Sequence, residues 1–214
     1  MTPPTMDSHN PTTGRTTCAH CLRPTKTCIC HLACDIHNQV EVLILQHPLE
    51  QKQTKGTARL LQLCLKHSQI VVGEQFDDEQ LKSLLGGNRQ NLLLYPAGHD
   101  ERSPTPEALA INPPNQLRLV VIDGTWRKSR KMLHLNPRLS QLPRLALEDA
   151  TPGEYRIRKA QASHQLSTLE ATAAALAALE HNDNRYVPLK TAFSAFIEQQ
   201  ITQMGRETFK KHYN

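Results

Sequence analysis

The sequence predicts an α/β fold in which a mostly parallel sheet is flanked by helices. Short apolar runs bounded by turn residues alternate with segments of helical periodicity along most of the chain, which is the pattern of strands joined by helices. Four closely spaced cysteines near the N-terminus predict a small arm attached to this fold. With 214 residues, the chain is long enough for one domain with a substantial core.

Composition narrows the class of protein. A net charge of +5 and a pI near 8.9 favour a polyanionic partner. Aromatic residues make up only 4% of the chain, which disfavours a wide base-stacking surface. No apolar run approaches the roughly 20 residues of a membrane span, and there is no secretory leader. We therefore expect a cytoplasmic protein, not bound to a membrane, whose cysteines are thiols or metal ligands.

The N-terminal region divides into a tail and an arm. Residues 1–17 are rich in Pro, Thr and Ser without apolar periodicity, so we expect a disordered tail. The arm, residues 18–36, has the spacing C-x2-C, six residues, then C-x-C, and its cysteines are Cys18, Cys21, Cys28 and Cys30. Four thiolates on two tight turns suit a closed, structural zinc site, with free thiols or a redox pair as alternatives. Arg23 and Lys26 would then be presented to RNA on a rigid knuckle.

The first half of the domain should alternate strands and helices. We expect, in order, a strand over 40–46, a helix over 57–67, a strand over 69–72, a helix from Asp77 or Asp78 to Leu85, and a strand over 91–95. Gly86 and Gly87 should end the second helix. Residues 99–116 contain four prolines and predict a long surface loop.

The second half begins with the apolar run 119–122, which predicts a buried strand ending at Asp123. Gly124 permits a tight turn, and Thr125 can cap a helix that carries Trp126 and four cations. These cations are Arg127, Lys128, Arg130 and Lys131. Ligands bind at the carboxyl ends of strands in open α/β sheets, so this turn is the candidate site. The alternative is that Asp123 caps the helix, Trp126 is core and the cations form a solvated face.

The remaining chain predicts a weak edge strand over 142–147 and two helices. The sequence Ser167-Thr168-Leu169-Glu170 is a capping box that opens an Ala-rich helix, whose N-terminus offers N–H groups to an anion. A second helix should start near Pro188, before a basic, exposed tail over 206–214. The chain has no G-x-G-x-x-G after a strand, no phosphate loop and no nucleophile elbow, which disfavours dinucleotide binding and nucleotide hydrolysis.

Four motifs occur together and in one order. They are the four-cysteine spacing, Gln46-His47-Pro48-Leu49-Glu50, Asp123-Gly124-Thr125-Trp126, and Tyr155-Arg156-Ile157-Arg158-Lys159 leading into Leu166-Ser167-Thr168-Leu169-Glu170. Together they resemble the DTW-domain family of tRNA-uridine aminocarboxypropyltransferases, and the compact chain is most similar to the bacterial branch. The resemblance runs from Cys18 past Glu180. One departure is Gly56-Thr57, where the family pattern has Asn-Thr.

The resemblance implies a fold and an activity. The fold is SPOUT-like with a C-terminal trefoil knot, in a catalytic domain over 37–205. The activity is transfer of the 3-amino-3-carboxypropyl group of S-adenosylmethionine to N3 of a tRNA uridine, with 5′-methylthioadenosine released. The bacterial branch suggests a uridine of the variable loop. Zinc in the arm and tRNA as substrate complete this expectation, and no protein partner is implied.

The resemblance also implies roles for individual residues. The expected catalytic residues are Asp123, Thr125 and Trp126, with Asp123 as the general base for the uridine imide. The expected cofactor pocket is formed by Pro96, Ala97, Ile122, Asp123, Gly124, Leu166, Ser167 and Thr168. The expected phosphate contacts are Arg23, Lys26, Arg127, Lys128, Arg130, Lys131, Arg156, Arg158 and Lys159.

Two other functions fit the same motifs. A methyltransferase would use the same cofactor on RNA and differ only in the carbon that it presents. A zinc-containing RNA-binding protein would need no catalysis, and its Asp-Gly-Thr-Trp stretch would be structural.

Overall fold

A parallel sheet of five strands organises the described part of the chain. The computed structural model describes residues 16–96, 112–147 and 166–213. The strands are β1 (Glu41–Gln46), β2 (Ser68–Val72), β3 (Gln90–Leu94), β4 (Leu117–Asp123) and β5 (Arg144–Leu145). Their order is β2-β1-β4-β3-β5, and every neighbouring pair is parallel. The predicted α/β fold with a parallel sheet is therefore confirmed.

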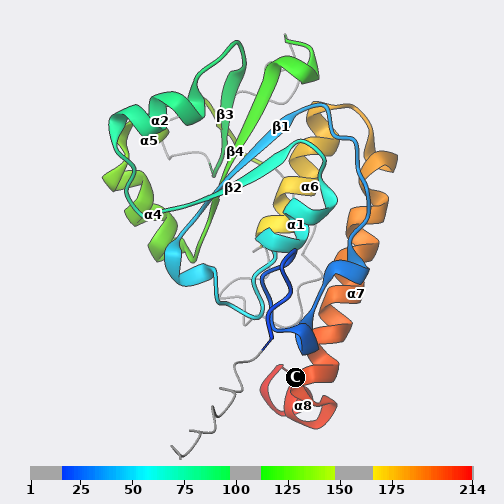
Figure 1. The fold of residues 1–214 in the computed structure, drawn as a ribbon. Coiled ribbons are helices and arrows are strands. Elements are labelled where there is room, and N and C mark those ends of the chain that lie inside the picture. Colours follow the sequence, from blue (N-terminus) through cyan, green and yellow to red (C-terminus); the bar gives the residue numbers. More distant parts are fainter. Residues whose placement is uncertain (1–15, 97–111, 148–165, 214) are drawn as a thin grey trace, which may run out of the picture.

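Helices cover both faces of this sheet (Figure 1). One side carries α1 (Ala58–Cys64), α6 (Thr168–Leu179) and α7 (Val187–Met204). The other carries α2 (Asp78–Leu85), α4 (Trp126–Leu135) and α5 (Pro137–Ser140). Short 3-10 turns connect the elements: η1 (Thr25–Thr27), η2 (Cys30–Leu32), η3 (Pro48–Glu50), η4 (Pro114–Gln116) and η5 (Asp183–Tyr186).

The central strands explain the two hydrophobic cores. Val42 and Ile44 of β1 face the α1, α6 and α7 side, whereas Leu43 and Leu45 face the α2, α4 and α5 side. All four side chains are fully buried. Strands covered on both faces carry continuous apolar runs, because successive side chains point to opposite faces and both faces are dry.

The predicted helix boundaries hold in most places. Asp77 caps α2 by accepting a hydrogen bond from the Gln80 backbone N–H at 2.7 Å. The first helix is shorter than the predicted 57–67, because the Cys64 carbonyl accepts a hydrogen bond from the Ile36 N–H at 2.9 Å and the chain then turns into β2. No helix among the described residues is long and apolar enough to cross a membrane.

Both ends of the described chain are more ordered than the sequence suggested. Thr17 pairs with Pro24 in an isolated bridge, so the arm begins before Cys18, while residues 1–15 of the predicted tail lie outside the described residues. The predicted basic tail forms helix α8 (Arg206–Tyr213), and Phe209 packs against the core. Gly205 separates α7 from α8 at φ 87°, a backbone conformation that glycine adopts without a steric cost.

Candidate functional site

The carboxyl ends of β1 and β4 bring a buried acid between two hydrogen-bond donors. Gln46 and Asp123 are register partners in the sheet. The Asp123 carboxylate is 6% exposed, its Oδ2 accepts from Gln46 Nε2 at 2.8 Å, and its Oδ1 accepts from Thr168 Oγ1 at 2.7 Å. Both partners donate and Asp123 accepts, an arrangement that suits an ionised carboxylate. Three elements, β1, β4 and α6, therefore fix one acidic group.

The turn after β4 leaves Asp123 out of helix capping. Thr125 is the N-cap of α4, and its side chain accepts from the Lys128 backbone N–H at 3.4 Å. Gly124 suits this turn because a Cβ there would lie 3.2 Å from the Lys128 Cβ. The alternative that Asp123 merely caps the basic helix is therefore wrong, since Thr125 does so.

The N-terminus of α6 lies beside the same acid. The predicted capping box is present: Ser167 Oγ accepts from the Glu170 N–H, and Glu170 Oε2 accepts from the Ser167 N–H at 2.8 Å. Ser167 is 2% exposed, so the helix start is fixed in the interior, with Thr168 as the first helical residue. The helix dipole favours a negative group at this end, and Asp123 occupies such a position. The Asp123 carboxylate is therefore one anionic group at this end of the helix.

A pocket of about 190 Å³ opens next to Asp123. Its walls come from η3 and the segment leading to α1, from the β4–α4 turn and from the start of α6. The lining residues are Glu50, Gln53, Lys55, Gly56, Thr57, Asp123, Thr125, Lys128 and Thr168. Of the predicted site residues, the structure brings Asp123, Thr125, Lys128 and Thr168 together at this pocket.

The other wall of the pocket was not predicted from the sequence. Gln53 and Lys55 come from a polar connection without periodicity, whereas Thr57 begins the predicted helix over 57–67. Gly56-Thr57 is where the family pattern differs. Glu50 belongs to the quoted Gln46–Glu50 motif, which follows a strand parallel to β4. Because carboxyl ends of parallel strands lie at one edge, that position was the available signal.

A buried ion pair closes one side of the pocket. Lys128 Nζ lies 2.7 Å from Glu50 Oε1, and the two side chains are 18% and 9% exposed. Lys128 was predicted to contact phosphate, but in this structure its ammonium faces Glu50 across the pocket wall. A zwitterionic ligand could separate this ion pair, so that the Lys128 ammonium binds the ligand's carboxylate and the Glu50 carboxylate binds its ammonium group.

A second polar group clamps the ends of β1 and β2 to α4. His47 Nδ1 accepts from the Leu49 N–H at 3.1 Å, so Nε2 carries the proton and donates to Glu74 Oε1 at 2.9 Å. Lys131 Nζ donates to Glu74 Oε2 at 2.9 Å. Hydrogen bonds from Lys131 and then from His47 lower the pKa of Glu74. The Glu74 carboxylate thus keeps α4 in place beside the pocket.

Trp126 lies on the surface beside this site and not in the core. Its side chain is 47% exposed and meets Tyr95 edge to face, with ring centroids 5.8 Å apart. The Arg144 guanidinium lies 5.8 Å from the Tyr95 ring centroid. The core alternative for Trp126 is therefore wrong.

The other predicted cofactor residues do not line this pocket or lie outside the described residues. Pro96 is exposed after β3, and Ile122, Gly124 and Leu166 are half-buried. Ala97 lies outside the described residues.

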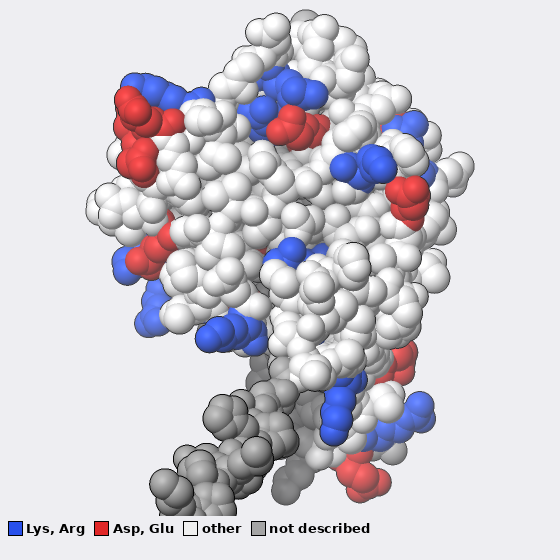
Figure 2. Space-filling view, viewed as in Figure 1, with Lys and Arg blue, Asp and Glu red and all other residues white. Residues whose placement is uncertain are grey.

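The predicted phosphate-binding residues fall into different surroundings. Lys26, Arg127 and Arg130 are exposed, and Lys131 is exposed but ion-paired with Glu74. Arg23 donates to the backbone carbonyls of Thr54 and Gly56 in the segment between η3 and α1. Arg156, Arg158 and Lys159 lie outside the described residues. On the face in Figure 2, Lys and Arg are interspersed with Asp and Glu, and the described residues form no continuous basic patch there.

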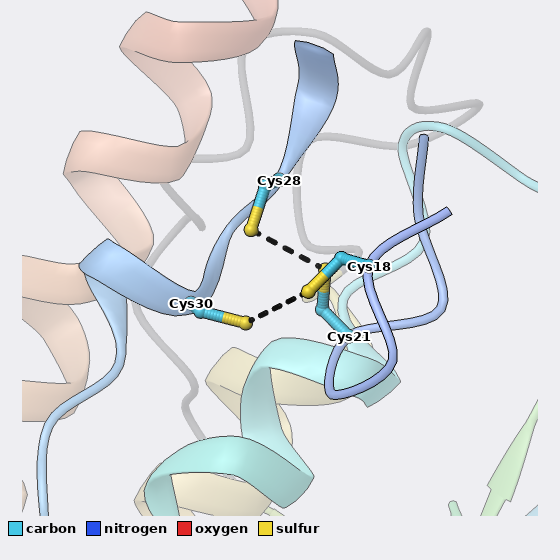
Figure 3. A group of neighbouring side chains, drawn as sticks. All are labelled: Cys18, Cys21, Cys28 and Cys30. Carbon is cyan, nitrogen blue, oxygen red and sulfur yellow. Dashed lines mark hydrogen bonds between the residues drawn. The ribbon is translucent and has the colours of Figure 1, made fainter. Parts of the chain in front are cut away.

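The four predicted metal ligands form one cluster (Figure 3). All four sulfur atoms lie within 4.8 Å of one another, with Cys18 and Cys30 at 3.6 Å and Cys21 and Cys28 at 3.7 Å. A tetrahedron with Zn–S bonds of about 2.3 Å has edges of about 3.8 Å, so the spacing fits zinc. The cluster itself is confirmed, and zinc as its ion stays a prediction.

Local hydrogen bonds favour a thiolate in this cluster. Backbone N–H groups of Cys21 and His20, with the Cys30 thiol, lower the pKa of Cys18 to about 6. Burial and then the neighbouring Cys18 raise the pKa of Cys30 to about 12. Cys34 and Cys64 stand apart from the cluster: the Cys34 N–H donates to Cys64 Sγ at 3.4 Å, and burial raises the pKa of Cys64 to about 12.

Comparison with known proteins places these features in one family. Residues 15–201 match the DTW domain. The chain belongs to the DTW-domain family. The match covers both the cysteine cluster and the Asp123 site, and it takes in the Asp123, Thr125 and Trp126 pattern that gives the domain its name. Helix α8 lies beyond the matched residues.

Several curated relatives of this DTW domain carry one name. The chain is 30% identical over 179 residues to tRNA-uridine aminocarboxypropyltransferase 2 of Macaca fascicularis, a match that covers 81% of this chain and 59% of the relative. It is 34% identical over 181 residues to the protein of that name in Drosophila melanogaster, covering 81% of this chain and 70% of the relative. The chain thus spans less than two thirds of the macaque protein. No solved structure matches the chain.

Proposed function

We propose that this DTW-domain protein transfers the 3-amino-3-carboxypropyl group of S-adenosylmethionine to N3 of a uridine in tRNA. The products would be 3-(3-amino-3-carboxypropyl)uridine and 5′-methylthioadenosine. The protein would act on tRNA in the cytoplasm. The names of its relatives support this activity. The observation that carries it is the buried Asp123 carboxylate, fixed by Gln46 and Thr168 at the wall of a pocket.

Asp123 suits the proton transfer that this reaction requires. Uridine N3 is an imide nitrogen that must lose its proton before it attacks carbon. In the proposed step the proton passes to Asp123, the N3 electron pair forms the new bond to the γ carbon, and the carbon–sulfur pair remains on sulfur, which leaves as 5′-methylthioadenosine. An ionised carboxylate accepts hydrogen bonds and can take up a proton, which is the chemistry that a general base needs. Positioned general bases of this kind typically contribute about 10²–10⁴-fold to the rate.

The pocket suits the amino acid end of the donor. The sulfonium of S-adenosylmethionine activates all three attached carbons. The protein must therefore position the γ carbon, and not the other two, for attack by the nucleophile. A volume of about 190 Å³ is below the roughly 300–1,000 Å³ of pockets for whole drug-sized ligands, so it fits one end of the molecule. Lys55 and Lys128 provide ammonium groups for a carboxylate, and Glu50 provides a carboxylate for an amine. We propose that this wall holds the group that is transferred.

We also propose the SPOUT-like knot and a zinc-bound arm for this protein. The knot is implied by the family resemblance, and it agrees with the return of α6 to the end of β4, where Thr168 bonds Asp123. The sulfur spacing supports zinc. A closed four-sulfur site leaves no open position for a substrate, so its role would be structural.

Exposed cations beside the site would hold the tRNA. Arg127 and Arg130 lie on α4, which starts at the Asp123 turn, and Lys26 lies on the arm. We propose that these residues contact phosphates, with Arg156, Arg158 and Lys159 as further candidates.

The test is the by-product formed by the purified protein from S-adenosylmethionine. We expect 5′-methylthioadenosine to form only when tRNA is present. Formation of S-adenosylhomocysteine instead would identify a methyltransferase. No consumption of S-adenosylmethionine with tRNA that binds normally would leave an RNA-binding protein.

A further inference from the structure

Arg23 joins the cysteine arm to the pocket. It lies between the two cysteine pairs, and its guanidinium leaves the arm to reach the segment between η3 and α1. One terminal nitrogen donates to the Thr54 carbonyl at 2.8 Å and the other to the Gly56 carbonyl at 2.9 Å. The guanidinium also lies 5.1 Å from the Phe196 ring centroid in α7. One side chain therefore contacts the arm, the pocket segment and the helical layer.

The segment that Arg23 holds forms one wall of the pocket. Gln53, Lys55, Gly56 and Thr57 line the pocket, and residues 51–54 are exposed. Within the segment, the Gln53 N–H donates to the Glu50 carbonyl and the Gly56 N–H to the Gln53 carbonyl, which makes successive tight turns. Turns with so little buried apolar surface open easily, so a cross-link from outside has a large effect on their shape.

The arm can provide such a cross-link only while it is itself rigid. The Arg23 carbonyl accepts from the Cys18 N–H at 2.8 Å, and the Leu22 N–H donates to the Cys18 carbonyl at 2.9 Å. These bonds close the turn from which Arg23 extends. On the other side, Gln199 Nε2 of α7 donates to the Cys28 carbonyl at 3.1 Å. Cys18 takes part in both bonds of the Arg23 turn and also contributes a sulfur to the cluster, so the turn and the cluster are directly connected.

We propose that Arg23 is a positioning residue through which the cysteine arm shapes the pocket. In its presence the segment 51–57 keeps its wall conformation, and loosening of the arm lowers the affinity of the pocket for its ligand. The identity of that ligand, S-adenosylmethionine, rests on the proposed function. A guanidinium is required because its planar fork spans two carbonyls at once, whereas a lysine ammonium is a single point of charge.

The test compares Arg23→Ala and Arg23→Lys with a matched control, Lys26→Ala, which removes an exposed cation from the same arm. The first measurement is backbone hydrogen exchange over residues 51–57 in the full chain. We expect the Gln53 and Gly56 amides to exchange at least several-fold faster in both Arg23 variants and at the wild-type rate in the control. Unchanged exchange in Arg23→Ala would overturn the proposal. This measurement needs no substrate, so it decides the proposal even if the chain does not use S-adenosylmethionine.

The second measurement is equilibrium binding of S-adenosylmethionine to the same proteins. We expect about tenfold weaker binding for Arg23→Ala, the scale of losing two charge-assisted hydrogen bonds partly compensated by water, with partial rescue by Arg23→Lys. In turnover, the KM for S-adenosylmethionine should rise more than kcat falls. Zinc content and thermal midpoint should stay close to wild type in Arg23→Lys, which keeps the test valid if Arg23→Ala folds poorly. Weaker tRNA binding with unchanged S-adenosylmethionine affinity would instead make Arg23 an RNA contact and overturn the proposal.

Discussion

Asp123 has surroundings that distinguish it from a surface acid. Its carboxylate is buried, and its two oxygens accept hydrogen bonds from residues on two different elements. Thr125 is the residue that caps the following helix. A buried charge costs stability unless it is paired or hydrogen-bonded, and Gln46 and Thr168 provide two such hydrogen bonds. We propose that the same arrangement prepares Asp123 for its catalytic role.

Replacing Asp123 with Asn tests that chemistry. The amide keeps an oxygen for the Thr168 hydroxyl, and Gln46 can rotate its own amide to accept from the new NH₂ group, so fold and metal content should be preserved. Turnover should fall by roughly a hundredfold or more, the usual weight of a general base. Residual activity should rise with pH, because hydroxide then removes the imide proton. Near wild-type turnover at neutral pH would refute the base assignment, and loss of S-adenosylmethionine binding would make Asp123 a cofactor-positioning residue.

Thr168 offers a matched pair of substitutions. Thr168→Val removes the hydroxyl that donates to Asp123 but keeps the side-chain shape, whereas Thr168→Ser keeps the hydroxyl. We expect kcat to fall about tenfold in Thr168→Val, because one donor to a charged group is worth roughly 1.5–3 kcal/mol and part of it is recovered from water. Thr168→Ser should retain most activity. Equal losses in both variants would show that the methyl group, and not the hydrogen bond, matters.

The residues of the candidate site could be predicted from the sequence where a recognisable motif marks the end of a strand or the start of a helix. Other site residues could not. Asp123 ends strand β4, and Thr168 begins helix α6. Sequence motifs mark both positions, so both residues could be predicted. Gln46 ends the predicted strand over 40–46, and its contact with Asp123 depends on the register between two strands that are far apart in the chain. Register is set by how the two strands pack, which periodicity does not contain.

At the scale of elements, helix α4 begins directly after Asp123 and is the helix that we propose to be linked most directly to the reaction. Its first turn follows Asp123, its buried side holds Met132 and Leu133, and its two lysines are paired with Glu50 and Glu74. In the sequence alone, the four cations after Trp126 are equivalent. The structure separates them into two ion-paired lysines and two exposed arginines, a difference created by acids that lie over fifty residues earlier.

Neutralising Arg127 and Arg130 to Gln should weaken tRNA binding. The slope of log affinity against log salt should become shallower by about two, because two phosphate contacts are lost. Arg138→Gln is the control, since Arg138 is an exposed arginine on the next helix that is paired with Asp78. S-adenosylmethionine affinity should be unchanged in both the double variant and the Arg138→Gln control. Equal tRNA binding by the double variant and the wild-type protein across salt concentrations would show that these arginines are solvent-exposed and do not contact tRNA.

The connecting segments were the least predictable elements. The strands β1 and β4 follow from continuous apolar runs, and α6 from its capping box. The segment 51–57 has neither pattern, yet it lines the pocket and binds Arg23. Its shape comes from backbone carbonyls, which every residue has, so no side-chain pattern marks it.

At the scale of the whole molecule, the arm and the sheet form one structure. The arm packs beside α7, and its cysteines contact the core that covers one face of the sheet (Figure 1). The spacing of the cysteines predicted their cluster correctly. Their position against α7 and the pocket segment could not be predicted, because it depends on contacts such as Gln199 with Cys28.

Zinc binding should require the four clustered cysteines. The purified chain should contain about one zinc ion, and Cys18→Ser should lose it together with thermal stability, because structural zinc contributes folding energy. Cys34→Ser is the control, since Cys34 stands apart from the four clustered sulfurs, and it should keep the metal. Elemental analysis that finds no metal in the wild-type chain would refute the zinc site.

The central claim is that this DTW domain adds an aminocarboxypropyl group to a tRNA uridine by using Asp123. The most direct measurement is mass spectrometry of tRNA nucleosides from a strain that lacks the protein, complemented with the wild-type chain or with Asp123→Asn. We predict 3-(3-amino-3-carboxypropyl)uridine with the wild-type chain, and a loss of nearly all of it with the variant at an equal protein level. A nucleoside profile that does not change among the three strains, or a methylated uridine that appears with the wild-type chain, would contradict the claim.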